Sequence, residues 1–232
     1  MGSGLKGAGW KSVSMVDVKG KVTFTVWLCG CNLRCPFCHN WRLAENDPSV
    51  CSNLDIKRLA DDLASARGLV DFFHVTGGEP LMQADEVVSL FRLAKDMGFK
   101  VSLNSNLTMP WVLTKVLGLI DHVATDVKLP EFYGYDTKTA SFIFANFLRS
   151  LDLISGEGIE LELRVPLARG YPKARYEEVM REALKHVRGR YYVVENRLLG
   201  PPLTDPRDKS WCEEHCYQDL DNLSKSLNAR TV

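Results

Sequence analysis

The most informative stretch of the chain is KVTFTVWLCGCNLRCPFCHN, residues 21–40. Residues 21–28 are rich in β-branched and aromatic side chains, which predicts a strand. The strand runs directly into a loop that holds Cys31, Cys35 and Cys38. A cubane iron–sulfur cluster has four irons and normally takes four Cys ligands. Three ligands from one loop would leave one iron open, so the stretch predicts a strand that ends in a reactive metal centre.

Strand and helix patterns alternate along the rest of the chain. Further strands are predicted at 71–76, 99–104, 122–127, 159–165 and 191–194, and helices at 54–66 (with Asn53 as N-cap), 84–97, 110–119, 139–154 and 176–187. Repeated strand–helix units require right-handed crossovers and a parallel sheet. The pattern therefore predicts an α/β fold, a partial, open (β/α)6 TIM-like barrel at 21–200, with an N-terminal extension at 1–20 and a C-terminal extension at 201–232.

Polar residues and glycines follow the predicted strands at the end where barrel enzymes carry out their chemistry. The candidates, in strand order, are the Cys loop, then Gly77, Gly78, Glu79 and Pro80, then Asn104, Ser105 and Asn106, then Asp126 and Lys128, then Arg164, and finally the run Glu195, Asn196 and Arg197. Asp126 and Lys128 are two residues apart, so they share one face of an extended segment.

Composition excludes several classes of protein. Lys+Arg and Asp+Glu balance at 29 each, so no excess of charge points to nucleic acid or anionic lipid. No apolar run approaches the roughly 18 residues expected of a membrane helix. The opening Met-Gly-Ser-Gly lacks an apolar signal core, which predicts a cytoplasmic protein. Clustered thiols in such a protein indicate metal binding rather than a disulfide framework.

The Cys spacing with Phe37, followed by Gly77-Gly78-Glu79-Pro80, resembles the radical S-adenosylmethionine (SAM) enzymes. The resemblance implies a 4Fe–4S cluster on Cys31, Cys35 and Cys38, with SAM on the open iron. It also implies that Phe37 packs against the adenine and that the Gly77–Pro80 loop holds the methionine amino group. The reduced cluster would break the sulfonium bond of SAM and release a 5′-deoxyadenosyl radical, which takes a hydrogen atom.

Within that superfamily the chain is similar to activases of glycyl radical enzymes, those of anaerobic ribonucleotide reductase and pyruvate formate-lyase. The segments that carry the similarity are GWKSVSMVD (9–17), CPFCHN (35–40), GGEPL (77–81), DVKLP (126–130) and LRVPL (163–167). The similarity implies a partner glycyl radical enzyme as hydrogen donor and a one-electron reductant such as flavodoxin or ferredoxin.

The same similarity suggests roles for the strand-end residues. Asp126 would help to bind a monovalent cation, Lys128 would meet the cofactor, and Arg164 would contact the cofactor's carboxylate or ribose. Asn104 stands where the activases usually have Asp, and a neutral amide is a weaker cation ligand. The sixth strand ends in Glu195-Asn196-Arg197 and lacks the His that the family uses there.

Several alternatives remain open at this stage. The three cysteines would form a zinc site if His39, or Cys212 with Cys216, completed the set. Cys29 suits a small buried hydrophobe. Cys51, Cys212 and Cys216 suit a zinc site, a second cluster, a disulfide or plain thiols. At the level of function, the alternatives are a radical SAM enzyme that modifies a small molecule or an RNA base, and a non-catalytic iron–sulfur or zinc module.

Overall fold

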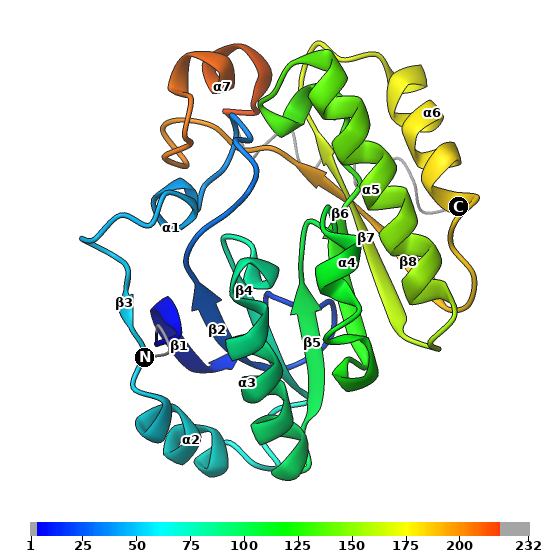
Figure 1. The fold of residues 1–232 in the computed structure, drawn as a ribbon. Helices are drawn as coiled ribbons and strands as arrows, with labels where there is room; N and C mark the ends of the chain where they lie inside the picture. The colour runs from blue at the N-terminus through cyan, green and yellow to red at the C-terminus, as the bar shows by residue number, and fades with distance from the viewer. Residues whose placement is uncertain (1–3, 219–232) are drawn as a thin grey trace.

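The structure is a computed structural model that describes residues 4–218, and it is built on one eight-stranded sheet (Figure 1). The strand order is β3-β1-β2-β4-β5-β6-β7-β8. The strands are β1 (Lys6–Ser14), β2 (Thr23–Leu28), β3 (Ser52–Asn53), β4 (Phe72–Gly77), β5 (Lys100–Asn104), β6 (His122–Asp126), β7 (Glu160–Leu167) and β8 (Tyr191–Arg197). Strand β2 and strands β4 to β8 are parallel to one another, which confirms the predicted open partial barrel.

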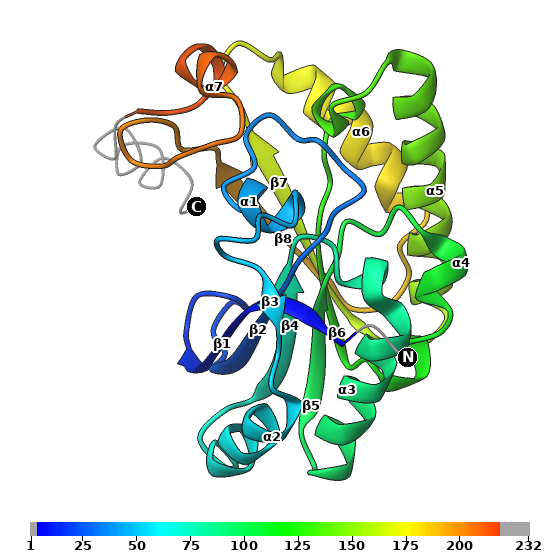
Figure 2. The same cartoon turned by 60° about the vertical axis from the view of Figure 1, so that its left-hand side comes forward.

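Most helices lie along one side of the sheet, as Figure 2 shows for α3, α4, α5 and α6. The α-helices are α1 (Trp41–Ala44), α2 (Ile56–Ser65), α3 (Ala84–Asp96), α4 (Pro110–Leu113), α5 (Thr137–Ser155), α6 (Lys173–Leu184) and α7 (Lys209–His215). Short 3₁₀ turns are η1 (Pro80–Gln83), η2 (Leu117–Leu119) and η3 (Pro130–Tyr133). No helix of the described residues combines the length and the apolar character needed to cross a membrane.

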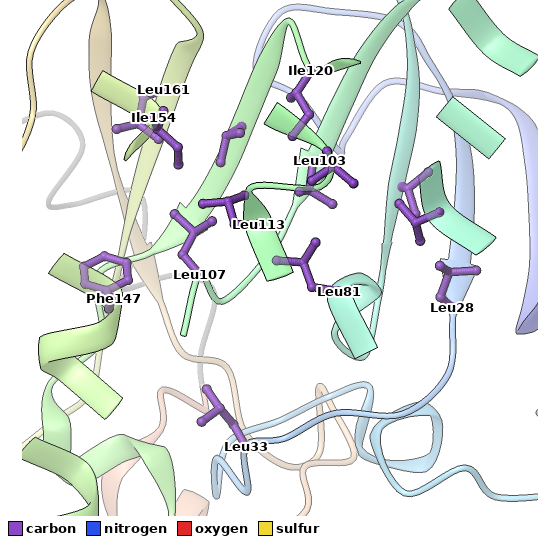
Figure 3. Packing of buried hydrophobic residues seen from close by; sticks show 14 of the residues in the cluster. Leu28, Leu33, Leu81, Leu103, Leu107, Leu113, Ile120, Phe147, Ile154 and Leu161 are labelled. Atoms are coloured by element: carbon purple, nitrogen blue, oxygen red, sulfur yellow. The ribbon is translucent and has the colours of Figure 1, made fainter. Parts of the chain in front are cut away.

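The core fills the space between the sheet and these helices. Figure 3 shows Leu28, Leu103 and Leu161 of the strands on the same side as Leu113 of α4 and Phe147 of α5. All five side chains are buried. Each such side chain contributes about 1.5–3 kcal/mol when it leaves water, so this layer holds the strands in the positions that bring their carboxyl ends together.

Two helix boundaries differ from the prediction for local reasons. Helix α2 begins at Ile56 because the Asp55 carboxylate, not Asn53, accepts the capping hydrogen bond from the Arg58 N–H at 3.0 Å. The predicted helix at 110–119 is split into α4 and η2. The Thr114 hydroxyl donates to the Trp111 carbonyl at 2.9 Å, a local bond that competes with the helix.

The expected extensions take part in the fold. Strand β1, within the expected N-terminal extension, pairs antiparallel with β2 and β3. After β8 the chain returns to the Cys loop and forms α7, which lies near α1 in Figure 1. Residues 219–232 of the expected C-terminal extension lie outside the described residues. Strand β8 ends the sheet, and no strand of residues 4–218 pairs with its outer edge.

Candidate active site

The carboxyl ends of the parallel strands border a cavity of about 470 Å³. Fourteen of the residues predicted from sequence line it together: Cys31, Cys35, Phe37, Cys38, Gly77, Gly78, Asn104, Ser105, Asn106, Asp126, Lys128, Arg164, Asn196 and Arg197. They come from six different strands and the loops that follow them. Glu79 and Pro80 are buried beside this cavity and do not line it. A larger hollow of about 620 Å³ lies between α6 and β8 and contains none of the predicted residues except Glu195 and Arg197.

The Cys loop presents three free thiols to the cavity, with Cys35 buried and Cys31 and Cys38 partly exposed. Burial, with a smaller contribution from the charge of Glu79, raises the pKa of Cys31 to about 11. Burial likewise raises the pKa of Cys35 to about 12, against the opposing effect of Lys128. These thiols are therefore protonated at neutral pH, and a metal centre that binds here must displace their protons.

The remaining cysteines are not available as ligands because they are paired with one another. Cys29 bonds Cys51, and Cys212 bonds Cys216. Cys29 is thus buried, as expected, but it is a disulfide partner rather than a simple hydrophobe. The His39 ring lies 3.0 Å from the Leu199 carbonyl, through Nε2. These contacts argue against both ways of completing a zinc site that the sequence allowed, with His39 or with Cys212 and Cys216.

The donor set that remains fits a cubane cluster. Among residues 4–218, no three His, Cys, Asp or Glu side chains converge closely enough to hold one metal ion. A mononuclear zinc site requires such convergence, with sulfur about 2.3 Å from the metal. In a cubane each thiolate binds a different iron, so the thiols need not meet at one point. Three thiols on one cavity wall, with no fourth free thiol in the sequence, suit a cluster with one open iron.

The glycines at the end of β4 allow two loops to approach closely. Gly77 has a φ of +124°, a conformation that L-residues rarely adopt. A Cβ on Gly78 would lie 2.2 Å from the Gly30 carbonyl oxygen, next to the Cys loop. The Gly78 position therefore requires glycine, and its backbone forms part of the cavity wall beside the thiols.

The Glu79 carboxylate joins two loops below this wall. It is fully buried and accepts hydrogen bonds from the Leu81 N–H at 3.0 Å, the Ser105 hydroxyl at 2.8 Å and the Asn106 N–H at 2.6 Å. Burial raises the pKa of Glu79, and these hydrogen bonds oppose that shift. The carboxylate thus ties the β4 loop to the β5 loop. A contact with the methionine end of SAM stays a prediction for Gly77 and Gly78, whose backbone lines the cavity.

An ion pair stands in the cavity wall after β6. The Lys128 ammonium lies 2.8 Å from the Asp126 carboxylate. Burial alone would raise the pKa of Asp126, but Lys128 and Arg164 together outweigh burial and the net shift is downward. Burial opposes the charge of Lys128, yet Asp126 holds the pKa of the ammonium above its ordinary value. Both groups are therefore charged. Asn104 lies nearby on β5, and its amide donates to the Thr76 hydroxyl at 3.0 Å.

Arg164 is held at the cavity by a buried polar network inside the sheet. Its Nε donates to the Glu162 carboxylate at 2.6 Å, and its Nη2 donates to the Asp17 carbonyl. The Tyr192 hydroxyl donates to the same carboxylate. Reasoning from the sequence missed Glu162, although it precedes Arg164 by two positions and so shares its strand face.

The network continues across the sheet through hydrogen-bonded side chains of neighbouring strands. The Ser102 hydroxyl lies 2.8 Å from a ring nitrogen of His74 and 2.8 Å from one of His122. Burial lowers the pKa of His74 to about 3 and also lowers the pKa of His122. Both rings are neutral near pH 7, so the interior below the cavity is polar without adding positive charge.

Two further residues contact the Cys loop. The Asn106 amide, which belongs to the polar run predicted at the end of the third strand, donates to the Asn32 side chain at 2.8 Å and reaches the Cys31 sulfur at 3.9 Å. The Arg207 backbone N–H donates to the Cys38 carbonyl at 3.1 Å, and Arg207 was not singled out from sequence.

Comparison with known proteins agrees with this geometry. A Methanocaldococcus jannaschii protein with the name "Putative glycyl-radical enzyme activating enzyme" is 29% identical over 188 residues, 78% of this chain and 75% of its own length. A 7-carboxy-7-deazaguanine synthase of Hyperthermus butylicus is 35% identical over 103 residues, 40% of this chain and 41% of its own length. Methylornithine synthase has a similar fold, with a TM-score of 0.60 at 13% identity over 88% of this chain and 60% of its own.

The match to a family model covers most of the described chain. The model of the radical SAM superfamily matches residues 25–205, a range that includes the Cys loop, the glycine loop after β4 and every other predicted site residue. The chain belongs to the radical SAM superfamily.

Proposed function

We propose that this radical SAM enzyme takes a hydrogen atom from a glycine residue of a partner glycyl radical enzyme. The observation that carries the proposal is the similarity to the Methanocaldococcus jannaschii protein named "Putative glycyl-radical enzyme activating enzyme", which extends over about three quarters of both chains. The cavity also suits a protein substrate, because its wall continues past the thiols to Asn196 and Arg197 at the open end of the sheet.

The residues of the chain have distinct tasks in this proposal. Cys31, Cys35 and Cys38 hold three irons and leave the fourth for SAM. When bound, the cluster supplies the electron that breaks the sulfonium bond of SAM. The Gly77-Gly78 backbone admits the methionine end close to the thiols, and Phe37 supplies an apolar surface for the adenine.

The charged wall orients the polar ends of SAM. Lys128 stays protonated beside Asp126, so its ammonium can donate to a carboxylate, while Asp126 can accept from an amine or hydroxyl. Within residues 4–218, Arg164 donates through Nε to Glu162 and through Nη2 to Asp17. A guanidinium has five N–H donors, so the others can reach a ligand. A monovalent cation at Asp126 remains a proposal, with the Lys128 ammonium already in contact with that carboxylate.

The test uses the enzyme with its cluster reconstituted under anaerobic conditions. Incubation with SAM, a one-electron reductant such as reduced flavodoxin and the partner enzyme should produce a stable organic radical in the electron paramagnetic resonance spectrum. Replacement of the partner's radical-bearing Gly by Ala should remove the signal. If SAM is cleaved to 5′-deoxyadenosine but no radical forms on any glycyl radical enzyme of the source genome, the activase proposal fails.

A second candidate is a small-molecule substrate, favoured by the similarity to 7-carboxy-7-deazaguanine synthase over 103 residues. This candidate predicts SAM cleavage that is stimulated by a low-molecular-weight extract of the source cells and not by its protein fraction. The activase proposal predicts the opposite dependence. The cytoplasmic location expected from the sequence stays a prediction under either candidate.

A further inference from the structure

The chain segment after β8 folds back on the Cys loop and holds it by backbone hydrogen bonds. The Arg207 N–H donates to the Cys38 carbonyl at 3.1 Å, and the Asp208 N–H donates to the Pro36 carbonyl at 2.9 Å. Both acceptors lie in the part of the loop that carries two of the three thiols. Arg207 follows the end of the region that matches the superfamily model, at residue 205.

The Arg207 side chain contacts the same loop from a second direction. Its Nη1 donates to the Leu33 carbonyl at 3.4 Å and the Cys35 carbonyl at 3.5 Å, while Nε pairs with Glu45 at 3.2 Å. Only 16% of the side chain is exposed, against 53% for Glu45. One residue therefore bonds three carbonyls of the loop, two of them belonging to cysteines that bear free thiols.

Aromatic packing fixes this segment in place. Helix α7 is capped by the Asp208 carboxylate, which accepts from the Trp211 N–H at 2.9 Å. The Trp211 ring packs 5.9 Å from Phe37 of the Cys loop and 5.7 Å from Phe132. Because the cap and the rings anchor the chain directly after Arg207, its guanidinium has a defined position beside the loop.

The position of this charge matters for a cluster ligated by the loop. The Arg207 guanidinium donates to the Leu33 and Cys35 carbonyls, so a positive charge lies against the loop that carries the three thiols. One-electron reduction adds one negative charge to the cluster and its thiolates, and no group is released in this step. A fixed positive charge stabilises that reduced state, and charge and hydrogen bonding are among the factors that set cluster potentials.

We propose that Arg207 is a positioning residue that holds the Cys loop in its ligating shape and raises the reduction potential of the cluster. The inference rests on membership of the superfamily and not on the identity of the hydrogen donor. Glu45 moderates the effect, because its carboxylate partly neutralises the same guanidinium. The geometry thus predicts opposite shifts of the potential when the two members of this pair are neutralised in turn.

The test compares four variants, each reconstituted with iron and sulfide: Arg207→Met, Arg207→Lys, Glu45→Gln and Arg42→Met. Arg42→Met is the matched control, since Arg42 is a nearby arginine that pairs with Asp205 at 3.8 Å and has a side chain 52% exposed. Two measurements need no partner enzyme and no turnover. One is the midpoint potential from a titration with dithionite followed by electron paramagnetic resonance, and the other is the rate of iron loss to a chelator.

Arg207→Met should shift the midpoint potential to a more negative value and speed iron loss about tenfold to a hundredfold, the usual effect of removing an outer-shell partner. Arg207→Lys should keep the potential near that of the wild type and lose iron at an intermediate rate. Glu45→Gln should shift the potential to a more positive value. Arg42→Met should match the wild type in both measurements.

The proposal is overturned if Arg207→Met equals Arg42→Met in potential and in iron loss. If Arg207→Met retains no iron, circular dichroism of the apoprotein separates misfolding from loss of the loop, and the other variants decide the effect on potential. A Glu45→Gln potential equal to that of the wild type, or more negative, contradicts the charge effect. These results do not depend on glycyl radical formation, so this inference and the activase proposal can fail separately.

Discussion

Removal of the Glu79 carboxylate should destabilise the protein even without cluster or SAM. The carboxylate is fully buried and accepts three hydrogen bonds, from the Leu81 N–H, the Ser105 hydroxyl and the Asn106 N–H. A hydrogen bond to a charged group contributes about 1.5–3 kcal/mol. The contributions of the three hydrogen bonds are not additive. Glu79→Ala also removes a carboxylate whose burial is itself unfavourable. Breaking a buried charged contact on one side typically costs about 3–5 kcal/mol, which is the expected loss.

The assay is urea denaturation of the apoprotein at pH 7.5, followed by circular dichroism. Glu157→Ala serves as the control, because Glu157 is an exposed carboxylate far along the chain, and its free energy of unfolding should change by less than about 0.5 kcal/mol. If Glu79→Ala matches this control and only weakens SAM binding to the loaded enzyme, the carboxylate is a ligand group and not the internal link inferred from the structure.

Three further outcomes are expected. Gly78→Ala should lower the free energy of unfolding by about 1–3 kcal/mol, because its Cβ would lie 2.2 Å from the Gly30 carbonyl oxygen. Gly118→Ala is the control and should be tolerated, because the space around Gly118 is open. Thermal melting compares the two variants. The reconstituted wild type should bind roughly four irons, and Cys35→Ala should abolish that binding. Retention of iron by Cys35→Ala in an iron and sulfide analysis would refute the assignment of Cys31, Cys35 and Cys38 as the ligands. Burial lowers the pKa of His74 from 6.5 to about 3, so unfolding takes up a proton within that window and stability should fall as the pH drops. Between pH 7 and 5 the loss from this residue is about 2 kcal/mol, and urea titrations of His74→Gln should show a smaller fall than the wild type.

Local patterns in the sequence predicted most of the strand-end residues that line the cavity. Cys31, Cys35 and Cys38 lie in one loop, and Gly77 and Gly78 directly follow a strand, so their spacing alone carries the information. The parallel order of the sheet then brings strand-end residues such as Arg164 to the same cavity, as predicted.

Contacts between distant segments of the chain could not be predicted from the sequence. Arg207 donates a hydrogen bond to the Cys35 carbonyl across 172 residues. Every residue has a backbone carbonyl, so the sequence does not indicate which one accepts. The Cys29–Cys51 pair was not identified, because several pairings of four cysteines are compatible with any one spacing. Strand β1 has the sequence KGAGWKSVS, with two glycines and no clear apolar alternation, so its own residues do not predict a strand and its backbone pairing with β2 decides its structure.

Strand β8 leaves a row of backbone N–H and C=O groups at the end of the sheet, within the part of the chain that the structure describes. Tyr191 and Val193 on this strand are 45% and 43% exposed, which makes the edge apolar as well as open. Such an edge can template strand addition by a second molecule and so begin aggregation. Glu195 and Arg197 place charges along the remaining length of the strand, and charged side chains are a common natural defence against this form of self-association. The charges of Glu195 and Arg197 therefore oppose self-association at a sheet edge that no other strand of residues 4–218 covers.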